Sequence, residues 1–212
     1  MNPSVLADAI GSENLQGADN QQERLLIVVL DVSQIPHRIG HYLAGFTDGE
    51  GSFNVSFRKR GDYAMPWKIS LCFNVSQRDE VILALFKQHL KCGTMRSRRD
   101  GVWYYEVNNF TAIVENVIPF FDWFGFLSAK KQRDFAKFKQ IARLLQMGRH
   151  LTKEGIDEIL TIRRDMNDGG AKRRKYSDDS IVELFGSRES SETTRQATAI
   201  GTTAVDDIVR SA

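Results

Sequence analysis

Two acidic residues set among glycines are the part of this sequence best suited to chemistry. Asp48 and Glu50 stand close to Gly45, Gly49 and Gly51. Gly45 and Gly49 are four residues apart, so on a helix they share one face and let another helix approach closely. A carboxylate at such a contact is costly unless a positive charge neutralises it, and a divalent cation is the natural candidate. The spacing therefore predicts carboxylates that hold a cation where helices meet.

The elements that must position these acids are a helix before them and a strand after them. Apolar residues recur at helical spacing over residues 36–48, which predicts a helix that ends at the acids. From Phe53 onward apolar and polar residues alternate, which predicts a half-buried strand over residues 52–59. Gly51 is suited to the backbone turn between the two elements.

The next part of the chain repeats the alternation and predicts one helix among three further strands. Ser76 is expected to cap this helix, with Asp79 in the capping-box position and Gly93 at the C′ position of its end. Asp100-Gly101 is a strong hairpin signal. The predicted strands cover residues 67–76, 94–98 and 102–108.

Helices follow the fourth strand. One of them is expected to stop around Pro119, and the aromatic residues of 120–127 are expected to lie in the core. The order of elements is that of an α+β protein with a four-stranded antiparallel sheet. The predicted helices cover residues 111–119, 128–147, 152–166 and a short segment at 176–185 that Ser177 caps.

The stretch from Leu43 to Gly51 reads L-A-G-F-T-D-G-E-G. It resembles the L-A-G-L-I-D-A-D-G motif of the homing endonucleases that carry this name; the alternative is a helix end with two solvated acids. Glu50 keeps the charge of the motif's last Asp and adds a methylene group. The resemblance covers roughly residues 36–168 and implies the αββαββα homing-endonuclease fold. Because one copy of the motif is present, it implies the single-motif, homodimeric, group I intron-encoded type.

The resemblance also implies an activity. The expected function is a site-specific double-strand break at a long pseudo-palindromic DNA target, which promotes intron homing. In the family a divalent cation, Mg²⁺ or another such as Mn²⁺ or Ca²⁺, activates water and stabilises the leaving oxygen. By resemblance Glu50 is the metal ligand, the carbonyl of Gly49 assists, and Asp48 caps or orients. The other expected catalytic residues are Gln77, near the water, and Lys130 or Lys131, near the phosphate, although a solvated first helical turn explains the lysine pair almost as well.

The distribution of charge predicts a polyanionic partner, although the net charge is only +2. Residues 52–99 contain ten basic and three acidic side chains. The polar side of the predicted sheet carries donors and acceptors of the kind that read base edges in the major groove, and its alternative is a solvated face. The expected contacts to double-stranded DNA are Asn54, Ser56, Arg58, Arg60, Lys68, Ser70, Asn74, Arg78, Arg96, Arg98, Tyr104, Glu106 and Asn108.

Cutting both strands requires two acidic sites, and one motif supplies one of them. A homodimer is therefore expected, with the motif helices packed across a twofold axis. The residues expected at this interface are Leu43, Ala44, Gly45, Asp48 and Gly49.

The predicted endonuclease domain covers residues 35–168. Residues 1–34 are expected to form a mostly disordered extension, and residues 169–212 a basic hinge, a short helix and a disordered tail. Cys72 and Cys92 form no metal or disulfide pattern, and no apolar run is long enough to cross a bilayer, so an intracellular protein with no membrane partner is expected. Arginine exceeds lysine by 18 to 11, which favours a bacterial cytoplasm or nucleoid over an organelle.

Two alternatives share the predicted fold. An RNA-binding maturase, with intron RNA as its partner, would need the basic surface but not Glu50. A DNA-binding regulator that does not cleave would also have no use for a buried acid cluster. The presence of both motif acids and of Gln77 favours an active nuclease.

Overall fold

The structure, a computed structural model, describes residues 29–61, 67–167 and 176–183. The motif helix α2 (His37–Glu50) runs directly into strand β1 (Gly51–Lys59), as predicted. Pro36 stands at the N-cap of α2, one residue before the helix begins. The other elements, in chain order, are η2 (Val32–Gln34) before α2 and then β2 (Trp67–Gln77), α3 (Glu80–Leu90), β3 (Thr94–Ser97), β4 (Trp103–Val107), α4 (Phe110–Ala112), η3 (Ile113–Val117), α5 (Ile118–Phe124), α6 (Ala129–Gln146), η4 (Arg149–Leu151) and α7 (Lys153–Arg164).

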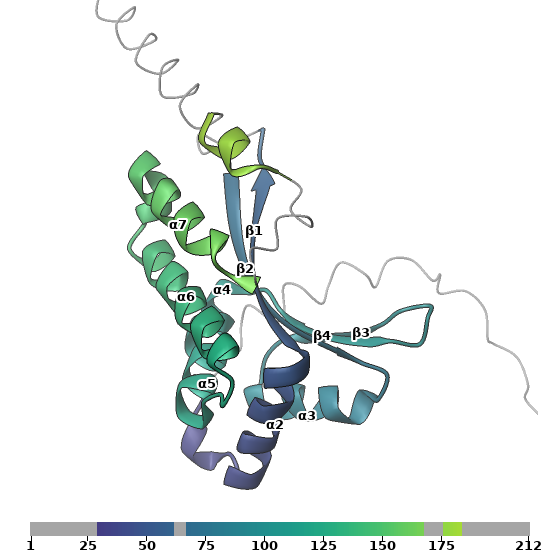
Figure 1. Ribbon diagram of the computed structural model, residues 1–212. Coiled ribbons are helices and arrows are strands. Elements are labelled where there is room, and N and C mark those ends of the chain that lie inside the picture. The colour runs from purple at the N-terminus through teal and green to yellow at the C-terminus, as the bar shows by residue number, and fades with distance from the viewer. Residues whose placement is uncertain (1–28, 62–66, 168–175, 184–212) are drawn as a thin grey trace, which may run out of the picture.

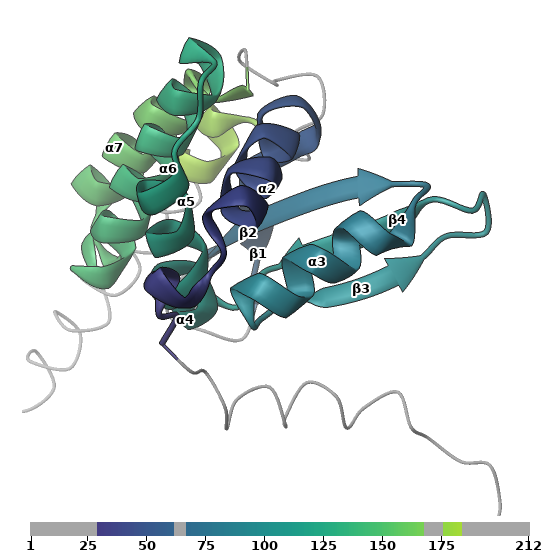
Figure 2. The same cartoon turned by 90° about the horizontal axis from the view of Figure 1, so that it is seen from below.

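The four strands form one antiparallel sheet in the order β1-β2-β4-β3. Its register places Gly51 opposite Val75 and Phe73 opposite Val107. Helices α2 and α3 lie across one face, and α5, α6 and α7 stack beside α2 (Figures 1 and 2). The predicted α+β architecture with a four-stranded antiparallel sheet is confirmed.

The core between sheet and helices is built from aromatic rings. The ring of Phe53 lies 5.3 Å from that of Phe73 and 5.1 Å from that of Phe138, measured between centroids. Phe121 meets both strands from α5, at 5.6 Å from Phe53 and 5.1 Å from Phe73. Phe120, Phe121, Phe124 and Phe126 are buried as expected, but Trp123 of the same stretch is 55% exposed, so the predicted core location is wrong for that residue.

Two predicted helix boundaries are wrong. Strand β2 continues through Ser76 to Gln77, and Asp79 caps α3 instead by accepting a hydrogen bond from the N–H of Val81 at 2.9 Å. The left-handed residue that ends α3 is Lys91, with φ of 54°. Gly93 comes later, with φ of 79°, and a Cβ there would lie 2.8 Å from the Tyr105 ring. Gly93 therefore serves the close approach of β4, not the helix end.

The helical segment after β4 does not stop at Pro119. A π-helical turn, η3, leads into α5, and Pro119 lies in the first turn of α5. Proline is tolerated there because its missing N–H has no partner to lose. The helix consequently continues to Phe124 and ends before Gly125, which has φ of 65°.

The predictions for both chain ends fall largely on residues 1–28, 168–175 and 184–212. These residues lie outside the ranges that the structure describes. Within the predicted N-terminal extension, Asp31 caps η2, and Leu30 is buried. No helix in the described part of the chain is both long and apolar enough to span a bilayer.

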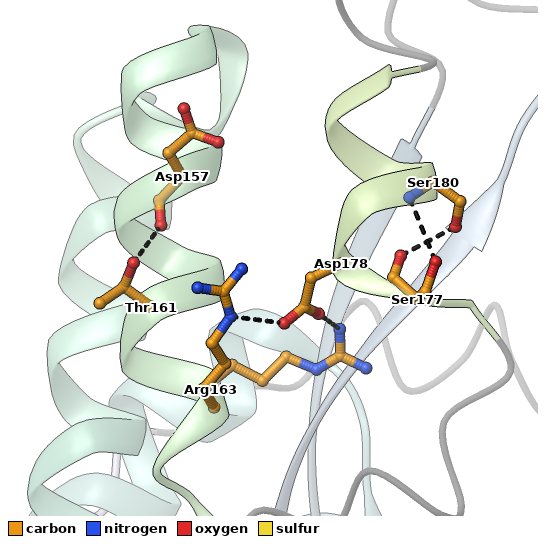
Figure 3. A network of polar contacts seen from close by, with 7 residues as sticks. Asp157, Thr161, Arg163, Ser177, Asp178 and Ser180 are labelled. Atoms are coloured by element: carbon orange, nitrogen blue, oxygen red, sulfur yellow. Dashed lines mark hydrogen bonds and ion pairs between the residues drawn. The ribbon is translucent and has the colours of Figure 1, made fainter.

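The segment 176–183, predicted to lie beyond the domain, packs on the domain's core. Ile181 is fully buried, and its carbonyl accepts a hydrogen bond from the indole N–H of Trp67 at 3.0 Å. Asp178 pairs with Arg163 at 3.6 Å and accepts from Nε of Arg164 at 2.8 Å (Figure 3). The buried guanidinium of Arg163 also lies 4.9 Å from the centre of the Phe57 ring.

These contacts place the segment at the outer end of the β1–β2 hairpin, where Phe57 and Trp67 also meet, with their ring centroids 6.4 Å apart. The packed unit therefore extends past residue 168, and the predicted boundary is too early. Sequence pattern could not show this, because a single buried isoleucine in a short polar helix has no periodicity to detect.

Replacing the buried side chain of this segment should destabilise the whole domain. We expect Ile181→Ala to lower the free energy of unfolding by about 2–5 kcal/mol, since it leaves a cavity in a packed core. Glu183→Ala, an exposed change in the same short helix, should stay within about 0.5 kcal/mol of the parent protein. Urea unfolding at one fixed protein concentration measures both. Equal unfolding midpoints for the two variants would show that the segment does not belong to the core.

Candidate functional site

The junction between α2 and β1 brings the motif acids to one end of the sheet. Gly51 has ordinary extended backbone angles, φ −79° and ψ 154°, so the predicted need for a special turn is wrong. The reason for glycine is space: a Cβ at Gly51 would lie 2.9 Å from the carbonyl oxygen of Thr47 and closer still to its methyl group. Because glycine has no Cβ, β1 can begin directly after α2 without a steric clash between residue 51 and Thr47.

The two acids have different environments. Glu50 is exposed at the last position of α2. Asp48 instead accepts hydrogen bonds from the N–H of Leu127 at 3.2 Å, the N–H of Ser128 at 2.9 Å and the hydroxyl of Ser128. Burial acts to raise the pKa of Asp48, but the bonds from Ser128 and Leu127 and the charge of Lys131 outweigh it and hold the pKa below its usual value. Asp48 is therefore a carboxylate engaged within the chain, whereas Glu50 faces solvent.

The structure separates the two candidate lysines. The ammonium of Lys131 donates a hydrogen bond to the carbonyl of Gly51, the residue after Glu50. Lys131 is half-buried, whereas Lys130 is exposed. Burial lowers the pKa of Lys131, and the charges of Asp134, Asp48 and Glu50 oppose this shift. Lys131 is therefore the lysine that lies at the end of the motif helix.

Gln77 reaches the same end of the sheet through the strand register. Gly51 pairs with Val75, so Gln77 lies two residues beyond this pair, on the side from which α2 enters β1. Its side-chain oxygen accepts the N–H of Arg78 at 2.7 Å. Four of the predicted site residues, Gly49, Glu50, Gln77 and Lys131, thus belong to one end of the sheet, whereas Lys130 is an exposed residue in the first turn of α6.

The face of the sheet opposite α2 and α3 carries the predicted DNA-binding side chains. Alternation along β1 and β2 buries Phe53, Leu71 and Phe73 under the helices and leaves the intervening residues half-buried or exposed. No described helix covers this polar side, which we call the open face. Its predicted members on strands are Asn54, Ser56, Arg58, Lys68, Ser70, Asn74, Arg96, Tyr104 and Glu106, and Arg60, Arg78, Arg98 and Asn108 lie just beyond strand ends.

Four more residues share the open face and were missed from the sequence. The same period of two that selected the others would have found them, because Ser52 pairs with Asn74, and Cys72 pairs with Asn54. Burial, with the charge of Glu106, raises the pKa of the Cys72 thiol to about 11, so this thiol stays protonated at neutral pH. The missed residues are Ser52, Cys72, Ser76 and Thr94.

The exposed side of α2 differs from the predicted one. Leu43 and Ala44 are buried in the protein's own core, so they cannot face a second copy, and Asp48 is engaged with the start of α6. Gly45 and Gly49 are exposed, and a Cβ on either would meet nothing within 4 Å. Tyr42 shares their side of the helix, is 49% exposed, and was missed although it lies at helical spacing from Gly45.

Comparisons with known proteins agree with this geometry. Residues 43–142 match the model of the LAGLIDADG endonuclease family. A probable intron-encoded endonuclease 2 of Neurospora crassa is 30% identical over 145 residues, which are 66% of this chain and 32% of that protein. DNA endonuclease I-CeuI of Chlamydomonas moewusii is 28% identical over 140 residues, covering 63% of this chain and 64% of that enzyme. The chain thus spans about a third of the first relative's length and nearly two thirds of the second's.

Solved structures extend the likeness to three dimensions. The homing endonuclease I-TnaI superposes with a TM-score of 0.61 at 28% identity, over 69% of this chain and 97% of that one. The meganuclease I-SmaMI, solved bound to DNA, superposes with a TM-score of 0.58 at 32% identity, over 61% of this chain and 45% of that one. The chain is thus similar to the LAGLIDADG endonuclease family over residues 43–142 and shares the fold of these solved homing endonucleases.

Proposed function

We propose that this chain is a site-specific DNA endonuclease that makes a double-strand break at a long, pseudo-palindromic target and thereby promotes the homing of its intron. The observation that carries the proposal is that the half-buried ammonium of Lys131 donates to the carbonyl of Gly51, the residue after the exposed carboxylate of Glu50, at one end of the open face. A carboxylate that can hold a cation and a positive side chain so placed can act on a phosphodiester that lies against the sheet. The names of the relatives support the same activity.

The donor set fits a cation shared with DNA. The described residues contain no group of three or more His, Cys, Asp or Glu side chains that could hold a metal by themselves. Mg²⁺ does not need such a group, because it keeps several waters and commonly binds through one or two carboxylates and substrate phosphates. Glu50 and the carbonyl of Gly49 would hold it, and the bound ion would supply an activated water and charge stabilisation at the scissile phosphate.

The protein residues have separate tasks in this proposal. Lys131 offers a positive charge beside the phosphate, and its contact with the carbonyl of Gly51 fixes where that charge lies. Gln77 orients the attacking water from the end of β2. Asp48 is a positioning residue, since its hydrogen bonds fasten the end of α2 to the start of α6. The open face holds the duplex through the polar and basic side chains named above.

A second copy would complete the site. One chain contributes one Glu50, and hydrolysis of both strands needs two such centres. Tyr42, Gly45 and Gly49 form an exposed strip along α2 on which an identical helix can pack closely. Leu127, which is 97% exposed, follows Phe126 beside the Asp48 end of this helix and would be covered in the same contact. We therefore propose a homodimer built on the exposed strip of α2.

The test of catalysis is the variant Glu50→Gln. We expect it to lose cleavage by on the order of 10³-fold or more, because a metal ligand worth several kcal/mol of transition-state stabilisation is removed. Binding to the target, measured by gel shift, should persist. The substrate is DNA carrying the site at which the intron is inserted, incubated with Mg²⁺ or with EDTA.

Glu154→Gln, an exposed change in α7, is the matched control and should cleave like the parent. Cleavage that survives in Glu50→Gln would remove that residue from the site. A parent protein that binds this DNA without cutting it in Mg²⁺ would favour a regulator, and one that binds only intron RNA would favour a maturase.

The test of assembly is Gly45→Leu. The substitution should not disturb the fold of the protomer, since the position is open and glycine is a poor helix former by about 1 kcal/mol. It should block the close approach of two helices and convert a dimer to a monomer. Light scattering on the two proteins measures the mass, and Ala84→Leu on the exposed side of α3 is the control. An unchanged dimer in Gly45→Leu would show that the copies meet elsewhere.

A further inference from the structure

The ion pair between Arg96 and Glu106 on the open face includes a carboxylate whose two oxygens both accept hydrogen bonds from side chains. Nη2 of Arg96 on β3 donates to Oε2 of Glu106 on β4 at 2.8 Å. Nδ2 of Asn108 donates to Oε1 of the same carboxylate at 3.0 Å. Both oxygens of Glu106 are therefore held, and the carboxylate cannot swing away from the arginine.

The guanidinium of Arg96 is the exposed member of this ion pair. The side chain of Arg96 is 65% exposed and that of Glu106 only 24% exposed, so the guanidinium stands over the acid and faces the duplex side. Register places Glu106 between Asn74 and Thr94, inside the sheet rather than at its rim. Exposed ion pairs of this kind contribute little to folding stability. We therefore look for the role of this ion pair in DNA binding and not in the stability of the fold.

A carboxylate in this place needs a reason, because DNA phosphates repel it. Arg58 and Lys68 pair with each other across β1 and β2 and are both exposed, which suits contacts to phosphates. Arg96 differs because Glu106 neutralises part of its attraction to phosphates and holds one of its terminal nitrogens, Nη2. A guanidinium fixed in this way matches the O6 and N7 acceptors of guanine in the major groove.

We propose that Arg96 reads a guanine in each half of the DNA target and that Glu106 is the positioning residue that keeps it from a neighbouring phosphate. The inference rests on the proposed function, since it concerns DNA held on the open face. The ring of Tyr104, which is paired with Arg96 in the register, is covered by the guanidinium of Arg98 at 4.1 Å. This contact keeps the second arginine away from the same base.

The experiment selects bound sequences from a library of randomised duplex DNA. The full chain carries Glu50→Gln so that the DNA is not consumed, and Arg96→Gln, Glu106→Gln or Arg143→Gln is added. Arg143 is exposed on α6, away from the open face, and serves as the matched control. The readouts are the base frequencies at each position and the affinity for random-sequence DNA at two salt concentrations.

We expect Arg96→Gln to lose discrimination for guanine by about tenfold at one position in each half-site while the other positions keep their preferences. Glu106→Gln should lose part of the same preference and bind random DNA more tightly, with a steeper salt dependence, because the released arginine reaches a phosphate. Arg143→Gln should match the parent.

If Arg96→Gln weakens all sequences equally and leaves every base preference intact, Arg96 is a phosphate contact and the inference is wrong. It is also wrong if Glu106→Gln leaves both readouts unchanged. A parent protein that enriches no sequence at all would overturn the proposed DNA function itself, which separates the two failures.

Discussion

The hydrogen bonds between Asp48 and the start of α6 are the constraint on which the rest of the candidate site depends. Ser128 is bonded to Asp48 and also caps α6, since its hydroxyl accepts the N–H of Lys131 at 3.2 Å. The carboxylate therefore lies where the partial positive charge of the α6 N-terminus favours it. Because the helix that carries Lys131 is fastened to the helix that carries Glu50, the lysine meets the carbonyl of Gly51 across a sequence distance of 80 residues.

This arrangement divides the work of the two motif acids. A carboxylate that accepts three hydrogen bonds inside the chain has little capacity left for a cation. The exposed carboxylate of Glu50, two residues further along α2, is the one we propose as the ligand. The absence of a side chain at Gly51, where a Cβ would collide with Thr47, allows the strand to start directly after Glu50. The positions of Asp48 and Glu50 in the motif are thus not equivalent, although their chemistry is the same.

Sequence pattern predicted those parts of the fold that depend on local periodicity. The alternation that begins at Phe53 was enough to place all four strands and the open face, because a half-buried strand has a strict period of two. Helix ends were less predictable. Asp79 rather than Ser76 caps α3 because β2 pairs with β4 up to Gln77, and pairing between distant strands is not visible in a local window.

The sequence predicted which residues belong to the candidate site, but it did not predict which of them contact one another. The motif resemblance selected Glu50, but it could not choose between Lys130 and Lys131. The choice depends on which of these two consecutive residues lies on the side of α6 that faces the end of α2, and this is decided by packing. It also placed Leu43 and Ala44 on the wrong side of α2, where the sheet and α5 bury them. The packing of Ile181 against Trp67 is a contact between residues 114 apart and had no signal in the sequence.

The most direct measurement of the central claim uses mixed dimers, because the claim is that Glu50 and Lys131 of the same chain act on one strand. Two tagged forms of the chain can be co-expressed and the mixed species isolated. With Glu50→Gln and Lys131→Met in the same subunit, we predict that the intact subunit still nicks one strand of the target. With one substitution in each subunit, we predict no nicking of either strand. Nicking by the second species and none by the first would contradict the account, since the acid and the lysine would then act across the dimer.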